Sequence, residues 1–172
     1  MGKVRKFAAS GRASIVALGP WCTATPFFAH PTLPTAMKLA TWNVNSLGVR
    51  LPQVLDWLAA NPVDVLALQE LKLSDDKFPA DAFEALGYHA QWFGQKTYNG
   101  VALLSRSPAT DILKNIPGFD DEMARVITGT VDCVRVIGAY FPNGQEPGSD
   151  KFEYKMEWLT ALRRWVKDEL AR

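Results

Sequence analysis

Polar side chains stand at the ends of three largely apolar segments in this sequence. Asn43 closes the first segment, Glu70 comes two residues after the second, and Tyr140 ends the third. Amide and carboxylate oxygens are ligands that a hard cation such as Mg²⁺ accepts, and a tyrosine hydroxyl can bind or polarise a phosphate oxygen. We interpret the three endings as parts of one active-site rim that handles a metal ion and a phosphate.

Each of these features also has an ordinary structural explanation. Asn favours turns whatever its function, and a single Glu after a strand is more often a solvated loop residue than a ligand. The segment Pro142-Asn143-Gly144, just after Tyr140, is a turn sequence in its own right. The chemistry is therefore a hypothesis about the three endings together and not about any one of them.

The elements that would position these residues are strands interleaved with a few helices. Apolar runs predict strands over residues 38–42, 63–68, 88–93, 101–105, 126–131 and 134–140. Apolar residues at helical spacing predict helices over residues 52–60, over residues 78–86 and from about residue 150 onward. Residues 106–124 are rich in Pro, Gly and Asp, which predicts a loop.

This order of elements predicts an α/β fold in which helices cover one face of a mixed sheet. The strands are apolar on their other face as well, and no further strands follow the last helical segment. We therefore expect that face to be bare and the chain to be prone to self-association.

The composition is that of one globular domain. Of 172 residues, 48% are hydrophobic and 22% are charged, and no apolar run approaches the length that spans a membrane. The two cysteines form no CxxC or Cys/His cluster, which is typical of a cytoplasmic protein without disulfide or zinc.

The first 36 residues differ from the rest. They carry four basic residues, no acidic residue, four prolines and no sustained period. We expect residues 1–36 to be a disordered leader or a spurious extension, because a well-patterned strand opens at Met37. The net charge is +1 in all and +4 in this leader, hence −3 in residues 37–172. A nucleic-acid partner would therefore need a local basic patch and a bound cation rather than bulk positive charge.

Four segments together resemble bacterial exonuclease III, the apurinic/apyrimidinic endonuclease branch of the endonuclease/exonuclease/phosphatase superfamily. They are residues 38–45, 64–72, 94–105 and 138–144, and they occur in the order and at the spacing of that family. The resemblance implies that residues 37–172 are the N-terminal portion of a four-layered α/β sandwich, with the second sheet largely missing. It also implies Mg²⁺-dependent cleavage of double-stranded DNA at abasic sites and 3′ ends by a monomer, with Mn²⁺ as an alternative cofactor.

The same resemblance assigns roles to individual residues. Glu70 matches the metal-binding Glu, and Asn43 matches the Asn that orients the site, so both are assigned to the metal. Tyr140 matches a tyrosine with a catalytic role. The candidates for contacts with the substrate are Asn143, Arg125 and Lys72.

The resemblance has one large departure. The family's second half carries a Gly-Asp-Phe-Asn motif and a Ser-Asp-His motif, and neither occurs in this sequence. The two histidines, His30 and His89, do not match a family catalytic position. Because general-base activation of water is worth roughly 10²–10⁴-fold, we expect these 172 residues alone to have little or no nuclease activity. Two alternatives remain open, a superfamily phosphoesterase acting on another phosphate ester and a non-catalytic fragment.

Overall fold

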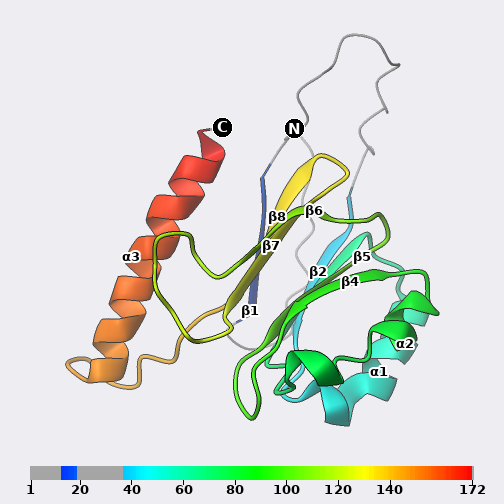
Figure 1. Cartoon of the computed structure of the whole chain (residues 1–172), viewed down its shortest axis with the longest axis horizontal. Helices are drawn as coiled ribbons and strands as arrows, with labels where there is room; N and C mark the ends of the chain where they lie inside the picture. Colours follow the sequence, from blue (N-terminus) through cyan, green and yellow to red (C-terminus); the bar gives the residue numbers. More distant parts are fainter. Residues whose placement is uncertain (1–12, 19–36, 172) are drawn as a thin grey trace.

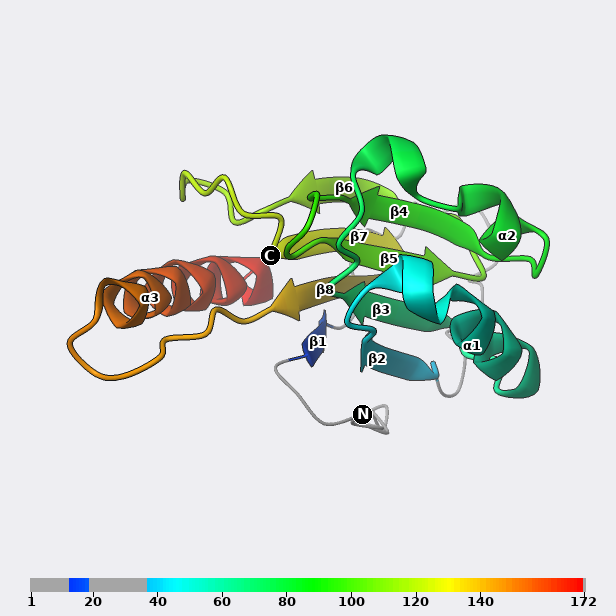
Figure 2. The same cartoon turned by 90° about the horizontal axis from the view of Figure 1, so that it is seen from below.

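Two four-stranded sheets packed face to face form the centre of the molecule, and helices cover their outer sides (Figures 1 and 2). This architecture comes from a computed structural model, which describes residues 13–18 and 37–171. The first sheet has the strand order β2-β3-β5-β4 and the second the order β1-β8-β7-β6.

The first sheet is mixed and carries helices on its outer face. Its strands are β2 (Leu39–Asn43), β3 (Val65–Gln69), β4 (His89–Phe93) and β5 (Val101–Ser105), with β2 parallel to β3 and the other neighbours antiparallel. The connections include α1 (Leu47–Ala60), a short 3₁₀ turn (Asp75–Lys77) and α2 (Ala80–Glu84).

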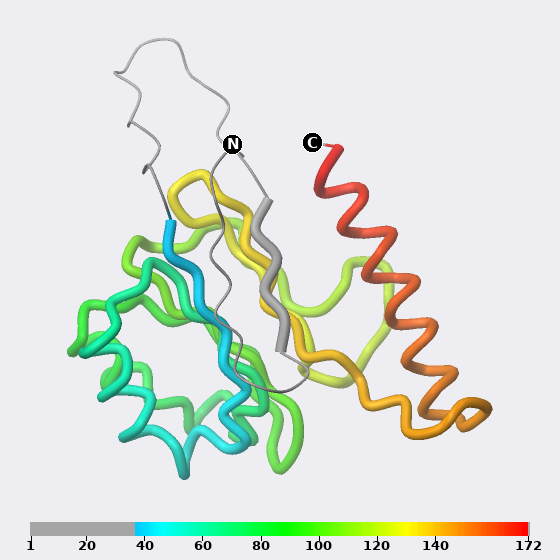
Figure 3. Tube along the Cα trace, turned by 180° about the vertical axis from the view of Figure 1, so that it is seen from behind, coloured from blue at the N-terminus to red at the C-terminus, as the bar shows by residue number. Residues whose placement is uncertain are grey.

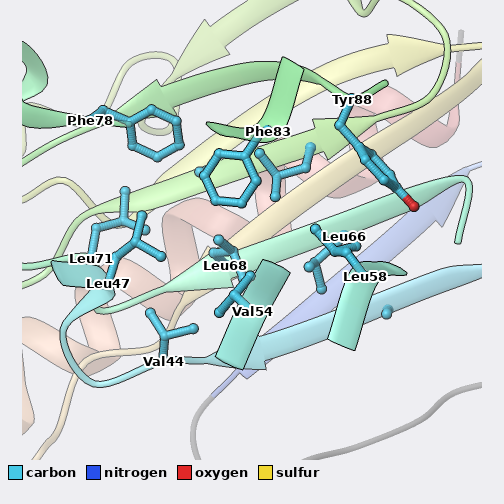
Figure 4. Packing of buried hydrophobic residues seen from close by; sticks show 13 residues of the cluster. Val44, Leu47, Val54, Leu58, Leu66, Leu68, Leu71, Phe78, Phe83 and Tyr88 are labelled. Atoms are coloured by element: carbon cyan, nitrogen blue, oxygen red, sulfur yellow. The ribbon is translucent and has the colours of Figure 1, made fainter. Parts of the chain in front are cut away.

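The central strand β3 is buried on both faces, as its nearly continuous apolar sequence predicts. Leu66 and Leu68 point to the helix side, where they pack with Leu58 of α1 and Phe83 of α2 (Figure 4). Val65 and Ala67, which alternate with these leucines along β3, point to the second sheet, because successive strand residues face opposite sides.

The second sheet is antiparallel throughout. Its strands are β1 (Ala13–Leu18), β6 (Thr110–Lys114), β7 (Val126–Val131) and β8 (Val134–Tyr140). The long helix α3 (Asp150–Leu170) packs on its outer face, on the opposite side of the molecule from α1 and α2 (Figures 1 and 3). The Ser149 side chain caps this helix by accepting a hydrogen bond from the Phe152 amide.

A buried ion pair ties α3 to the second sheet. Arg135 of β8 donates from Nε to Glu169 Oε2 over 3.0 Å, and both side chains are at most 2% exposed. Trp165 Nε1 donates to the other carboxylate oxygen of Glu169. Arg135 also donates to the carbonyl oxygen of Asp111 and to Thr130 Oγ1. These bonds compensate for the burial of both charges.

The two sheets come close together at Gly138. A Cβ atom at this position would lie 3.3 Å from both Ala67 Cβ of β3 and Leu103 Cδ2 of β5. Only glycine leaves the sheets this close without displacing a neighbour. Since Tyr140 is two residues further along β8, its side chain points into the same space between the sheets, next to the end of β3.

The predicted α/β class is confirmed, and so is the prediction that the chain corresponds to about half of a larger α/β sandwich. The second layer is more complete than expected, because part of the predicted loop 106–124 forms β6 and the 126–140 hairpin packs on the first sheet. The apolar face that we expected to be bare is covered by this sheet, so the stated reason for self-association does not hold for the described residues. Strand β6 is mostly exposed and irregular, which explains why no alternating pattern marked it.

Residues 13–18 also differ from the expected leader, because they form β1 and pair with β8 in register. Six residues are too few for a signal-peptide core but are an ordinary length for a strand. The rest of the predicted leader lies outside the described residues, and its boundary at residue 36 stays a prediction.

Two further findings concern the predicted cellular setting. Cys133, in the turn between β7 and β8, is disulfide-bonded, which corrects the expectation of a protein without disulfides. The other cysteine of the sequence, Cys22, lies outside the described residues. Within the part that the structure describes, no helix has the length and apolar composition needed to cross a bilayer.

Candidate active site

The parallel pairing of β2 and β3 brings Asn43 and Glu70 together. Asn43 lies opposite Gln69 in the register, so the next residue of the chain, Glu70, falls beside the Asn43 side chain. Asn43 Nδ2 donates to Glu70 Oε1 over 2.7 Å, while Asn43 Oδ1 accepts from the Asn45 amide. The Glu70 carboxylate is thus oriented by an amide that is itself fixed by the following turn.

The backbone at this edge of the sheet is held in an uncommon conformation. Asn45, Ser46, Glu70 and Lys72 have φ angles of 45°, 86°, 55° and 55°, in the left-handed region. Such residues cost of order 1–3 kcal/mol each and persist where the surroundings fix them, often at functional sites. Here the Ser46 amide donates to the Glu70 carbonyl oxygen over 2.8 Å, which links the two turns to each other.

Lys72 lies inside this cluster. Its Nζ is 3.3 Å from Glu70 Oε2 and donates to Asn45 Oδ1 over 2.6 Å. We predicted Lys72 as a contact for the substrate, and the structure places its ammonium group beside Glu70 and Asn45, so the substrate role stays a prediction. Sequence spacing could not show this, because the positive φ at Lys72 redirects the side chain.

Tyr140 reaches the same carboxylate from the second sheet. Burial raises the pKa of Glu70, but hydrogen bonds from Asn43, Tyr140 and Lys72 together with the Lys72 charge outweigh it. The net pKa of Glu70 therefore lies below its usual range, and the carboxylate is ionised at neutral pH. An ionised oxygen donor is the form that binds a divalent cation.

Arg125 and Asn143, the other two predicted substrate contacts, lie on either side of Tyr140. The Arg125 guanidinium lies over the Tyr140 ring, with Cζ 5.1 Å from the ring centroid, and the Arg125 carbonyl oxygen accepts from the Tyr140 amide. Asn143 is exposed on the loop after β8, where its side-chain oxygen accepts from the Gln145 amide. The structure therefore brings Arg125 against Tyr140, whereas the Asn143 side chain is exposed and bonds to its own loop; the substrate role of both residues stays a prediction.

Sequence reasoning missed Gln69, which lies directly beneath Glu70. Gln69 is fully buried and donates to Thr41 Oγ1, while its Oε1 has no hydrogen-bond partner among the described residues. A polar residue in an otherwise apolar strand was the available signal. Sequence reasoning also missed Tyr154, which accepts a hydrogen bond from Arg125, and Asp121, which accepts one from Tyr154. No motif singled out either residue.

The donor set fits a weakly held Mg²⁺ ion. Among the described residues no group of three or more His, Cys, Asp or Glu side chains could hold a metal. However, Mg²⁺ is commonly bound by only one or two carboxylates and keeps several waters. The ionised Glu70 supplies one carboxylate, and Asn43 Oδ1 retains acceptor capacity beyond its bond to the Asn45 amide. The assignment of both residues to the metal stays a prediction.

Known proteins resemble this chain over most of its length. Exodeoxyribonuclease III of Haemophilus influenzae is 32% identical over 139 residues, which are 77% of this chain and 52% of that protein. A Neisseria 3′ phosphatase, NExo, solved with product DNA hairpin, superposes with a TM-score of 0.78 at 56% identity, covering 80% of this chain and 54% of the other. An AP endonuclease from Archaeoglobus fulgidus gives a TM-score of 0.74 at 36% identity, covering 77% and 51%.

This chain spans about half the length of these relatives. They confirm the resemblance to exonuclease III and the AP endonucleases. The family model described as Endonuclease/Exonuclease/phosphatase family matches residues 40–171, which include the ends of β2, β3 and β8. The chain belongs to the endonuclease/exonuclease/phosphatase family.

Proposed function

We propose that this chain supplies the metal-binding and phosphate-binding side of a Mg²⁺-dependent DNA repair nuclease that cleaves phosphodiesters at abasic sites and 3′ ends. One observation carries the proposal: Glu70 receives hydrogen bonds from residues of both sheets, namely Asn43 and Tyr140. A carboxylate held ionised at the junction of two sheets, with an arginine over the ring of its tyrosine partner, suits a cation and a phosphate bound close together.

Each residue has a definite task in this proposal. Glu70 offers its ionised carboxylate to the cation, and Asn43 fixes the orientation of that carboxylate. The Tyr140 hydroxyl has one proton, which it donates to Glu70 in this structure. It can donate to a phosphate oxygen instead once a cation takes its place at the carboxylate. A bound Mg²⁺ would stabilise negative charge on the phosphate as a Lewis acid.

The names of the relatives support DNA as the substrate class. They are an exodeoxyribonuclease, an AP endonuclease and a 3′ phosphatase with bound DNA. Double-stranded DNA, abasic sites and Mg²⁺ are the parts of the proposal that go beyond family membership. The two motifs missing from the sequence lead us to propose, in addition, that the 172 residues alone turn over DNA poorly.

The test is a cleavage and binding assay on a labelled duplex that contains one abasic site, with Mg²⁺ and with H. influenzae exodeoxyribonuclease III as reference. We expect the chain to bind the duplex and to cleave it at least about 10²-fold more slowly than the reference. Glu70→Gln removes any residual cleavage, and Arg125→Gln weakens binding.

The outcomes separate the alternatives. Turnover near that of the reference would keep the DNA function and overturn the expected inactivity. Failure to bind or cleave DNA, together with Glu70-dependent hydrolysis of bis(p-nitrophenyl) phosphate, would favour another phosphoesterase of the superfamily. Absence of all three activities would leave a non-catalytic fragment.

A further inference from the structure

The Arg125 guanidinium is held between two tyrosine rings. Its Cζ is 5.1 Å from the centroid of Tyr140 and 5.7 Å from that of Tyr154, a residue of α3. Arg125 Nη1 is buried and has no hydrogen-bond partner among the described residues. Buried polar atoms are rarely left in this state, and at the edge of a phosphate-handling site such a donor points to an anionic ligand.

The other edge of the guanidinium is fixed by Tyr154. Arg125 Nε donates to the Tyr154 hydroxyl oxygen over 3.1 Å, and that hydroxyl lies 2.9 Å from Asp121 Oδ2. A tyrosine hydroxyl has one proton, and Arg125 can only donate. The Tyr154 proton must therefore point to Asp121, which gives the chain of bonds a single direction.

Asp121 is itself held in place. Its Oδ1 accepts from the Met123 amide over 2.9 Å, and its carbonyl oxygen accepts from Asn115 Nδ2 over 2.6 Å. Asn115 Oδ1 in turn accepts from the Arg125 amide. Burial and the bond to Asp121 raise the pKa of Tyr154 to about 12, so the hydroxyl keeps its proton at any working pH.

We propose that Tyr154 is a positioning residue that keeps Arg125 available for a DNA phosphate by separating it from Asp121. An arginine beside a carboxylate normally forms a direct, often bidentate ion pair that uses up its donors. The interposed hydroxyl binds both groups and satisfies the carboxylate, so the buried Arg125 Nη1 keeps its hydrogen-bonding capacity for a ligand that reaches it. This inference rests on the proposed function of the same site, and it adds Tyr154 and Asp121 to it.

The proposal predicts a specific pattern of rescue. In Tyr154→Phe the hydroxyl is gone, and Arg125 closes onto Asp121. Affinity for a labelled abasic duplex then falls about tenfold, and the salt dependence of binding loses about one phosphate contact, a change of roughly 0.9 in slope. Adding Asp121→Asn removes the competing carboxylate and restores most of the affinity. Tyr154→Phe has no further effect in an Arg125→Gln background.

A closely matched control exists in the same chain. Tyr88 also has an arginine over its ring, with Arg106 Cζ 4.5 Å from the centroid, and its hydroxyl both donates to and accepts from the Val63 backbone. It lies in the core on the helix side of the first sheet (Figure 4). Tyr88→Phe therefore makes the same chemical change away from the site and leaves DNA affinity unchanged. A purely structural role for Tyr154 predicts instead that the Asp121→Asn double variant binds worse than the single one, which would overturn the proposal.

A second readout needs no DNA. The ¹⁵N-resolved NMR signal of the Arg125 Nε–H group reports its hydrogen bond, and we expect its shift and its exchange with water to change in Tyr154→Phe but not in Tyr88→Phe. An unchanged signal in Tyr154→Phe overturns the positioning role whatever the DNA data show. If the wild-type chain binds no DNA while the signal responds as expected, the proposed function fails and the positioning of Arg125 by Tyr154 stands.

Discussion

The buried ion pair between Arg135 and Glu169 makes the sharpest prediction about stability. Both side chains are at most 2% exposed, and the Nε to Oε2 distance is 3.0 Å. In Glu169→Gln the arginine keeps its bonds to Asp111 and Thr130 but loses the opposite charge in a buried setting. Removing one partner of such a pair costs about 3–5 kcal/mol. This is a large part of the 5–15 kcal/mol that is typical for a folded domain.

The assay is urea unfolding at pH 7, followed by the near-UV signal of the tryptophans. With a urea m-value of about 1–3 kcal/mol/M, the midpoint of Glu169→Gln falls by at least about 1 M. The double variant Arg135→Met, Glu169→Met removes both charges but also leaves Trp165 Nε1 and the Asp111 carbonyl oxygen without these partners, so its midpoint should lie between those of Glu169→Gln and the wild type. Such a result shows that much of the loss in the single variant comes from removing the charge opposite Arg135.

The control is the exposed pair between Lys114 and Asp75, at 3.5 Å and about half exposed on both sides. Lys114→Met should change stability by less than about 1 kcal/mol. A Glu169→Gln cost as small as that of Lys114→Met would refute the reasoning. So would a double variant that loses the sum of the two single changes.

Three further predictions concern other parts of the molecule. Folding raises the pKa of Tyr154 to about 12 from an unfolded value near 10. Its contribution to the free energy of unfolding is therefore complete below pH 10 and is lost as the pH rises toward 12. Urea unfolding at a series of pH values should show a smaller alkaline loss of stability in Tyr154→Phe than in the wild type. Lys72→Met removes a hydrogen bond and a positive charge from Glu70, so the carboxyl pKa measured by NMR should rise. Gly94→Ala places a Cβ 2.6 Å from the Leu73 carbonyl oxygen and should cost about 1–3 kcal/mol in urea unfolding. Gly48→Ala, in helix α1, places its Cβ in ordinary contact, 3.7 Å from Leu73 Cδ2, and should not destabilise.

The contact between Asn43 and Glu70 could be predicted from sequence because strand ends carry both residues. Parallel strands align their ends, so Asn43 and Glu70 had to meet once β2 and β3 were neighbours. The strand endings also put Tyr140 on the same rim, and the family resemblance gave it a catalytic role, but neither showed that it reaches Glu70 from a different sheet. The resemblance also pointed to Arg125 but not to what holds it.

The parts that sequence did not predict depend on long-range contacts. Lys72 turns back onto Glu70 through a left-handed backbone conformation. Tyr154 reaches Arg125 from helix α3, although the two residues are 29 positions apart in the chain. Strand β6 has no alternating pattern because its side chains are mostly exposed. In each case tertiary geometry, and not residue type or spacing, decides the contact.

The most direct test of a cation site at Glu70 is a Mn²⁺ titration of the 172-residue chain followed by electron paramagnetic resonance, which needs no turnover. We predict one bound Mn²⁺ that is displaced by Mg²⁺ and is lost in Glu70→Gln, while Tyr88→Phe binds as the wild type does. Equal Mn²⁺ binding by wild type and Glu70→Gln would contradict the assignment of Glu70 to the metal, as would a wild-type chain that binds no Mn²⁺.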